Sequence, residues 1–105
     1  MATVYISIGN SDDKLTQLQW HAFHAAVNAL VRRFASRIYG DWVSPSTEMW
    51  QNACIAAEIP AEHIDVLKAL LGRHAFDYLQ DSIAWAEATT EFVAAQAPEA
   101  ADDVR

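Results

Sequence analysis

The sequence predicts an α+β fold of the ferredoxin-like type, a βαββαβ sandwich with two helices on one face of an antiparallel four-stranded sheet. Two observations lead to it. Segments with the pattern of strands lie near both ends of the 105-residue chain. Between them lie two segments with helical periodicity, which are separated by further extended segments. The right-handed crossover rule places the first two strands parallel, with the third between them and the fourth beside the first.

The first strand is predicted from alternation. Residues 3–8 read T-V-Y-I-S-I, so Val4, Ile6 and Ile8 share one face of an extended segment. The turn-forming run 9–13 then ends the strand.

The first helix has a marked beginning. Thr16 and Gln19 have the spacing of a capping box, and Leu15 and Trp20 that of a hydrophobic staple. Apolar residues at helical spacing predict a helix over 16–38, with Gly40 as its C-terminal cap. That apolar stripe comprises Phe23, Val27, Leu30, Val31, Phe34 and Ile38.

The middle of the chain predicts two extended segments and the second helix. Residues 41–44 form a short extended run before Pro45, and 52–59 read as a strand. Pro60 suits a first helical position, and Gly72 is a point where this helix can be interrupted. The second helix is marked by Ile64, Leu67, Leu71 and Tyr78.

Residues 82–87 fit two patterns. Ile83 and Trp85 alternate as in a strand, whereas a longer apolar series through this region keeps the spacing of a helix. The break at 81–82 favours the strand, and the four-stranded sheet depends on it.

Length and composition limit the protein to a single α+β domain over 1–93, followed by a disordered, acidic and Ala-rich tail over 94–105. No signal peptide and no membrane-spanning apolar run are visible, so we expect a cytoplasmic protein. The lone Cys54 excludes a disulfide framework and a Cys-based zinc site.

The formal net charge is −7, from 14 acidic and 7 basic residues. This balance disfavours nucleic acid and anionic membranes as partners. Basic charge is concentrated in Arg32, Arg33 and Arg37, which form either a solvated helix face or a docking patch for the acidic half of a second copy.

The predicted topology gathers polar residues at one sheet edge, where the first strand ends and the third and fourth begin. Amides, hydroxyls and a helix N-terminus there suit a polar ligand. The same residue types are also those that turns require. The candidate ligand-binding residues are Asn10, Asp12, Asp13, His21, His24, Asn52, Asp81 and Trp85.

His21 and His24 have a spacing that can hold a metal together with Asp12 or Asp13. Because no third ligand has diagnostic spacing, we expect solvated histidines, no metal and no cofactor. No phosphate loop, nucleophile elbow or dinucleotide motif is present, so no catalytic residue is assigned.

The sheet face away from the helices is predicted to carry rings. Tyr5, Cys54 and Trp85 point there in one register, which indicates dimerisation or a ligand pocket, or equally a set of scattered surface aromatics. We therefore expect a non-enzymatic, homodimeric module that binds a protein or a small polar ligand. The alternative is a cofactor-free dimeric α+β barrel enzyme, such as a monooxygenase or isomerase, with His21 or His24 as base and Trp85 lining its pocket.

The opening V-Y-I-S-I-G-N-S-D-D-K-L, together with Gln51-Asn52-Ala53-Cys54 and Asp81-Ser82-Ile83-Ala84, resembles small uncharacterised proteins of actinobacteria and their phages or plasmids. The resemblance covers most of the chain and implies no characterised family. It suggests a phage- or plasmid-encoded modulator of a host system.

Overall fold

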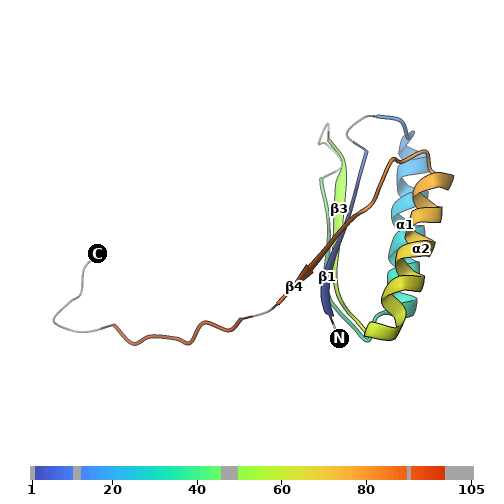
Figure 1. Cartoon of the computed structure of the whole chain (residues 1–105). Helices are drawn as coiled ribbons and strands as arrows, with labels where there is room; N and C mark the ends of the chain where they lie inside the picture. The colour runs from blue at the N-terminus through green and yellow to red at the C-terminus, as the bar shows by residue number, and fades with distance from the viewer. Residues whose placement is uncertain (1, 11–12, 46–49, 90, 99–105) are drawn as a thin grey trace.

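The computed structural model describes residues 2–10, 13–45, 50–89 and 91–98. Two helices pack against one face of a four-stranded sheet (Figure 1). The sheet has the order β2-β3-β1-β4, and each neighbouring pair is antiparallel. The predicted ferredoxin-like α+β fold is confirmed. The elements are β1 (Ala2–Gly9), α1 (Gln17–Phe34), β2 (Arg37–Val43), β3 (Asn52–Ile59), η1 (Ala61–His63), α2 (Ile64–Asp77) and β4 (Ala84–Ala88).

The register separates the sheet into two faces. Val4, Ile6 and Ile8 of β1 lie opposite Ala57, Ile55 and Ala53 of β3, and all six are buried beneath the helices. The alternate residues of β1 therefore lie on the other face, which no helix covers. We call this second surface the open face; its partners in register include the pairs Thr3–Glu58, Tyr5–Ala56 and Ser7–Cys54.

Helix α1 begins as predicted. The Thr16 hydroxyl accepts a hydrogen bond from the Gln19 backbone N–H, and the Gln19 side chain accepts one from the Thr16 N–H. Both donors would otherwise lack a partner in the first turn, so the reciprocal bonds define where the helix starts. Leu15 and Trp20 of the predicted staple are both buried in the core.

The predicted end of this helix at residue 38 is wrong. The helix stops at Phe34, Ala35 is its extended C-cap, and Ile38 lies in β2. A spacing of four residues, as between Phe34 and Ile38, places side chains on one face in a helix and in a strand alike, so the apolar pattern did not separate the two. The decision comes from β3: the Ser36 N–H donates to the Glu58 carbonyl, 2.9 Å away.

Gly40 is likewise not a helix cap, since it lies within β2, where the register shifts between Ile38 and Gly40. No described glycine has a positive φ. A Cβ at Gly40 would lie 3.1 Å from two ring carbons of Trp42, so the missing side chain makes room for the indole. Strand β2 thus starts earlier than the extended run predicted at 41–44.

Strand β3 has the predicted bounds, and Pro60 after it is the N-cap of η1, not a first helical residue. The single 3₁₀ turn leads directly into α2, which continues through Gly72 without interruption. Leu67 and Leu71 of α2 face the core as the periodicity predicted.

Residues 84–88 form strand β4, which pairs with β1 and confirms the strand prediction. Trp85 lies opposite Ile6, so its side chain is on the helix face, and only Tyr5 and Cys54 of the three predicted residues lie on the open face. The described residues 91–98 have neither helix nor strand and are exposed, and they extend away from the domain (Figure 1). Disorder over 94–105 stays a prediction, and 99–105 fall outside the described residues.

The core lies between the sheet and the helices. Phe23 is fully buried at its centre and stacks on Tyr78 with ring centroids 5.0 Å apart. Leu67 from α2 and Val31 from α1 complete the interior and are also fully buried. Within the described part of the chain, no helix has the length and apolar character needed to cross a membrane.

Candidate functional site

The polar rim predicted at the sheet edge centres on Asn10. Its side chain is 2% exposed; Oδ1 accepts from the Leu15 N–H, and Nδ2 donates to the Leu15 carbonyl, each at 3.0 Å. Nδ2 also donates to Oε1 of Gln51, which exchanges further hydrogen bonds with Gln17. These bonds close the loop between β1 and α1. The side-chain amides are therefore hydrogen-bonded within the protein. We call this set of bonds the loop clamp, because it holds the β1–α1 loop in place, and it leaves these amides little capacity to bind a ligand.

Other predicted rim residues lie around this clamp. Asp13 is exposed and has a φ of 57°, which Asp tolerates better than most residues. The adjacent Lys14 reaches Asp81 at 3.9 Å and so links the β1–α1 loop to the segment before β4. The Asn52 side chain donates to the Trp50 carbonyl, and the Asn52 backbone N–H donates to Ser44 Oγ. Asp12 lies outside the described residues.

The two histidines of α1 have different surroundings. His24 stacks on Trp20 with ring centroids 6.2 Å apart, and the hollow beside it measures only about 10 Å³. His21 is exposed beside a shallow hollow that Gln17 and Gln51 also line. In the described part of the chain, no three His, Cys, Asp or Glu side chains are close enough together to hold a metal ion.

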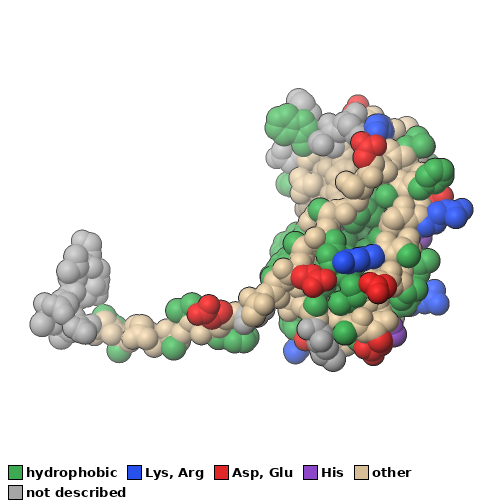
Figure 2. All heavy atoms as spheres, viewed as in Figure 1, with side chains coloured by type: hydrophobic (Ala, Val, Ile, Leu, Met, Phe, Trp, Pro, Cys, Tyr) green, Lys and Arg blue, Asp and Glu red, His purple; other side chains and the backbone are tan. Residues whose placement is uncertain are grey.

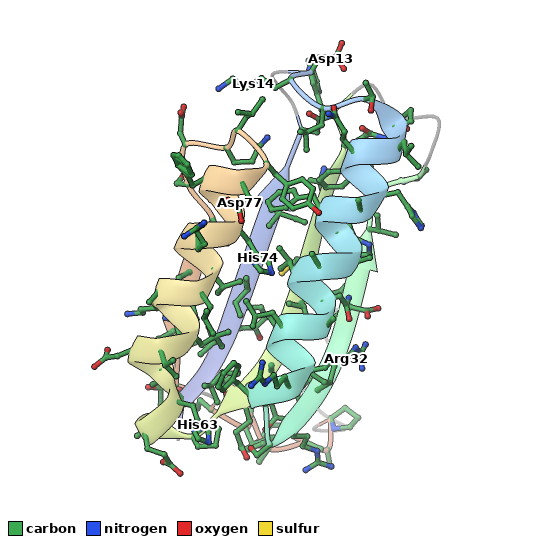
Figure 3. All side chains as sticks on the ribbon, turned by 90° about the vertical axis from the view of Figure 1, so that its right-hand side faces the viewer. Asp13, Lys14, Arg32, His63, His74 and Asp77 are labelled. Carbon is green, nitrogen blue, oxygen red and sulfur yellow. The ribbon has the colours of Figure 1, made fainter. Side chains whose placement is uncertain are left out.

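The basic residues predicted as a possible patch are separated. Arg32, on the side of α1 next to β2 (Figure 3), pairs with Asp41 at 2.7 Å. Asn28 also donates a hydrogen bond to Asp41. The hydrogen bond from Asn28 makes the largest contribution to lowering the pKa of Asp41 below its usual value, and the hydrogen bond from Arg32 makes the next largest. Arg33 lies over the Phe34 ring, whereas Arg37 lies over Tyr39 on β2. The arginines therefore serve local contacts on different surfaces.

The open face carries a group of rings. Tyr5 is 42% exposed, Tyr39 50% and Trp42 56%, and all three line one cleft of about 470 Å³ with Ala56 beneath them. The Tyr39 hydroxyl donates to Glu58 at 3.1 Å. This bond, followed by partial desolvation and the carboxylate charge, raises the pKa of Tyr39. The sequence analysis did not assign Tyr39 to this face because it placed that residue between the predicted helix and its Gly40 cap. It placed Trp42 in the extended run 41–44 but had no register from which to assign its face.

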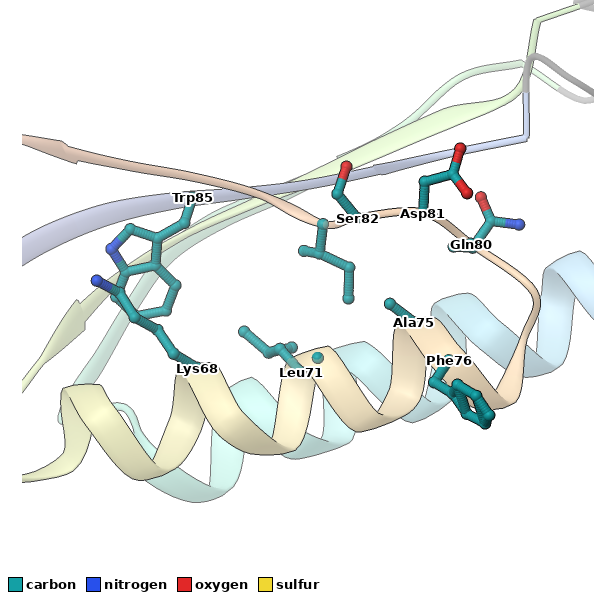
Figure 4. A pocket seen from close by; sticks show the side chains of 10 residues that line it. Lys68, Leu71, Ala75, Phe76, Gln80, Asp81, Ser82 and Trp85 are labelled. Carbon is teal, nitrogen blue, oxygen red and sulfur yellow. The ribbon is translucent and has the colours of Figure 1, made fainter.

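A second hollow, which we call the α2–β4 groove, lies on the helix side of the molecule and measures about 490 Å³. Leu71 and Ala75 of α2 lie on one side and Trp85 of β4 on the other (Figure 4), and Ile83 also lines the groove. Of the predicted site residues, Trp85 and Asp81 line it, at opposite ends. The feature of the sequence that could have indicated this groove is Gly72, an isolated glycine within a helical pattern.

The fold and these surfaces define a small ferredoxin-like α+β domain with an aromatic open face and a groove between its second helix and its edge strand. No protein-family model matches the chain, and no curated protein is similar to it in sequence.

Proposed function

We propose that this protein is a small non-enzymatic interaction module that forms a homodimer through its open face and binds a protein or a small polar ligand. The observation that carries the proposal is the cluster of Tyr5, Tyr39 and Trp42, each about half exposed on one sheet face. Contiguous exposed rings of this kind are typical of association surfaces, because their burial removes a large apolar area from water. A role as a phage- or plasmid-encoded modulator of a host system fits this class.

Charge favours a second copy as the occupant of this face. The chain carries a net charge of −7, so two copies repel over most of their surface. On the open face the charged strand residues are one base and one acid, Arg37 and Glu58, which are opposite each other in the β2–β3 register. The face is thus close to neutral where the rest of the chain is acidic.

The available area also suits a dimer. Strands of up to eight residues in a four-stranded sheet give a face of roughly 20 Å by 25 Å, about 500 Å². Two such faces together bury on the order of 1,000 Å², the lower limit for a specific interface. Phe92 is 90% exposed in the segment after β4 and lines the same cleft, so that segment adds apolar area.

Light scattering coupled to size-exclusion chromatography tests the dimer. The expected mass is twice the chain mass of 11.7 kDa. Trp42→Glu places two new carboxylates in a symmetric interface and is expected to give the monomer. Leu18→Glu, which makes the same charge change at an exposed position of α1, is the matched control and leaves the dimer intact. A wild-type protein that stays monomeric at every concentration contradicts the proposal.

A cofactor-free dimeric α+β barrel enzyme remains the second candidate, and Trp85 lining the α2–β4 groove favours it. The proposed bases do not join that tryptophan, because neither His21 nor His24 lines the groove. Such an enzyme therefore needs another base. If the protein is such an enzyme, Trp85→Ala should abolish its turnover. His21→Ala and His24→Ala should leave turnover unchanged, because neither histidine lines the groove.

A further inference from the structure

The α2–β4 groove has the dimensions and lining of a small-molecule site. Its volume of about 490 Å³ falls within the range of roughly 300–1,000 Å³ that ligand pockets occupy. In Figure 2, hydrophobic side chains line the hollow between β4 and α2, and one basic side chain crosses it with an acidic side chain on either side. The walls are formed chiefly by Leu71, Ala75, Ile83 and Trp85.

Gly72 lines this groove, and neither its backbone conformation nor its packing requires a glycine there. A glycine inside a helix costs about 1 kcal/mol relative to alanine. Close packing or a positive φ ordinarily explains such a residue, but a Cβ at Gly72 would meet nothing within 4 Å, and its φ is not positive. The side chain that is missing would project into the groove, since Gly72 lines it. The glycine therefore leaves this part of the groove open.

The two ends of the groove differ in charge. At one end the Lys68 ammonium lies 5.1 Å from the centroid of the Trp85 ring, and at the other end lie Gln80 and Asp81 (Figure 4). None of the ion pairs among described residues involves Lys68. Glu87 accepts a hydrogen bond from the indole N–H of Trp85 at 3.1 Å, and Asp65 precedes Lys68 by three residues on α2. Among the residues that line the groove, Lys68 is the basic one and Asp81 the acidic one, so an anionic group is placed more favourably at the Lys68 end than at the Asp81 end.

We propose that the α2–β4 groove binds a small organic acid with an apolar body, its anionic group at Lys68 and its apolar part over Gly72, between Leu71 and Ile83. The indole of Trp85 covers the junction between the two parts. The proposal deepens the ligand-binding half of the proposed function. Its surface is separate from the open face, so a failed groove and a failed dimer give different results.

Fluorescence titration with 1-anilinonaphthalene-8-sulfonate tests the site, because this apolar anion becomes bright in a dry environment. A ligand of its size is expected to bind with a Kd on the order of tens of micromolar. Gly72→Leu fills the groove and should weaken binding at least tenfold, whereas Gly72→Ala adds one methyl group and should weaken it much less. Leu18→Glu, at an exposed position of α1 outside the groove, should leave the Kd within twofold of wild type.

The charge preference is tested with Lys68→Met, which keeps the length of the side chain. Binding of the anionic probe should fall about fivefold, and binding of the neutral N-phenyl-1-naphthylamine should stay within twofold. Circular dichroism and thermal melting establish that each variant is folded. Decanoate should displace the anionic probe from the wild type more effectively than 1-decanol does.

Three outcomes overturn the proposal. Unchanged probe binding in a folded Gly72→Leu variant places the probe elsewhere. An equal loss of both probes in Lys68→Met removes the preference for acids. Binding that weakens as the protein concentration rises shows that a second copy occupies the groove instead of a small ligand.

Discussion

Replacing Gly72 by alanine should stabilise the protein, and the structure sets the size of the effect. The new Cβ meets no atom within 4 Å, so the substitution adds no strain and recovers the helix propensity lost at glycine, about 1 kcal/mol. For a domain of this size, that gain corresponds to a rise in Tm of about 4–8 °C. Urea unfolding followed by circular dichroism measures the free energy directly.

Gly40→Ala is the matched comparison, because it adds the same methyl group in a different environment. There the Cβ would lie 3.1 Å from Cη2 and Cζ2 of Trp42, and the indole must move to admit it. We expect no stabilisation and a shift in tryptophan emission. If Gly72→Ala leaves the free energy of unfolding unchanged or lowers it, or if Gly40→Ala stabilises the protein as much, the reading of the groove as open space is wrong.

Three further predictions concern the core, the rim and pH. Leu67→Ala, at a fully buried position of α2, should cost about 2–5 kcal/mol in urea unfolding, and a loss below about 1 kcal/mol contradicts the packing described. Asn10→Ala leaves the Leu15 N–H without its partner and should cost about 2–3 kcal/mol, and a neutral effect refutes the loop clamp. The lowered pKa of Asp41 means that its folded-state contribution is present above its ordinary pKa of 3.8 and lost as the pH falls through the folded-state value. Asp41→Asn should remove this acid-dependent loss of stability, and because the pair with Arg32 is exposed, the difference should be less than about 1 kcal/mol. If the urea midpoints of the wild type and the variant change in parallel across that pH range, Asp41 does not contribute in this way.

Much of the candidate site could not be predicted from the sequence, because it depends on contacts between residues that are far apart in the chain. The rim prediction placed Asn10 and Asp81 near one edge, and the structure does link both to the β1–α1 loop. The hydrogen bonds that engage Asn10 depend on Leu15 and Gln51 arriving at the same place, which no local pattern indicates. The open face was anticipated from Tyr5, but its two other rings lie in β2. The helix prediction left Tyr39 outside any strand, whereas Trp42 lay in the predicted extended run 41–44 without a face assigned to it.

The sequence by itself determined the order of the elements, the start of α1 and the buried row of β1, because capping boxes and period-two alternation are written in neighbouring residues. Only the tertiary structure decided where α1 ends and which face Trp85 occupies. At Ile38 the four-residue spacing fits helix and strand equally, and pairing with β3 selects the strand. At Trp85 the register opposite Ile6 directs the ring to the helix side, because a shift of one residue would exchange the two faces of the strand.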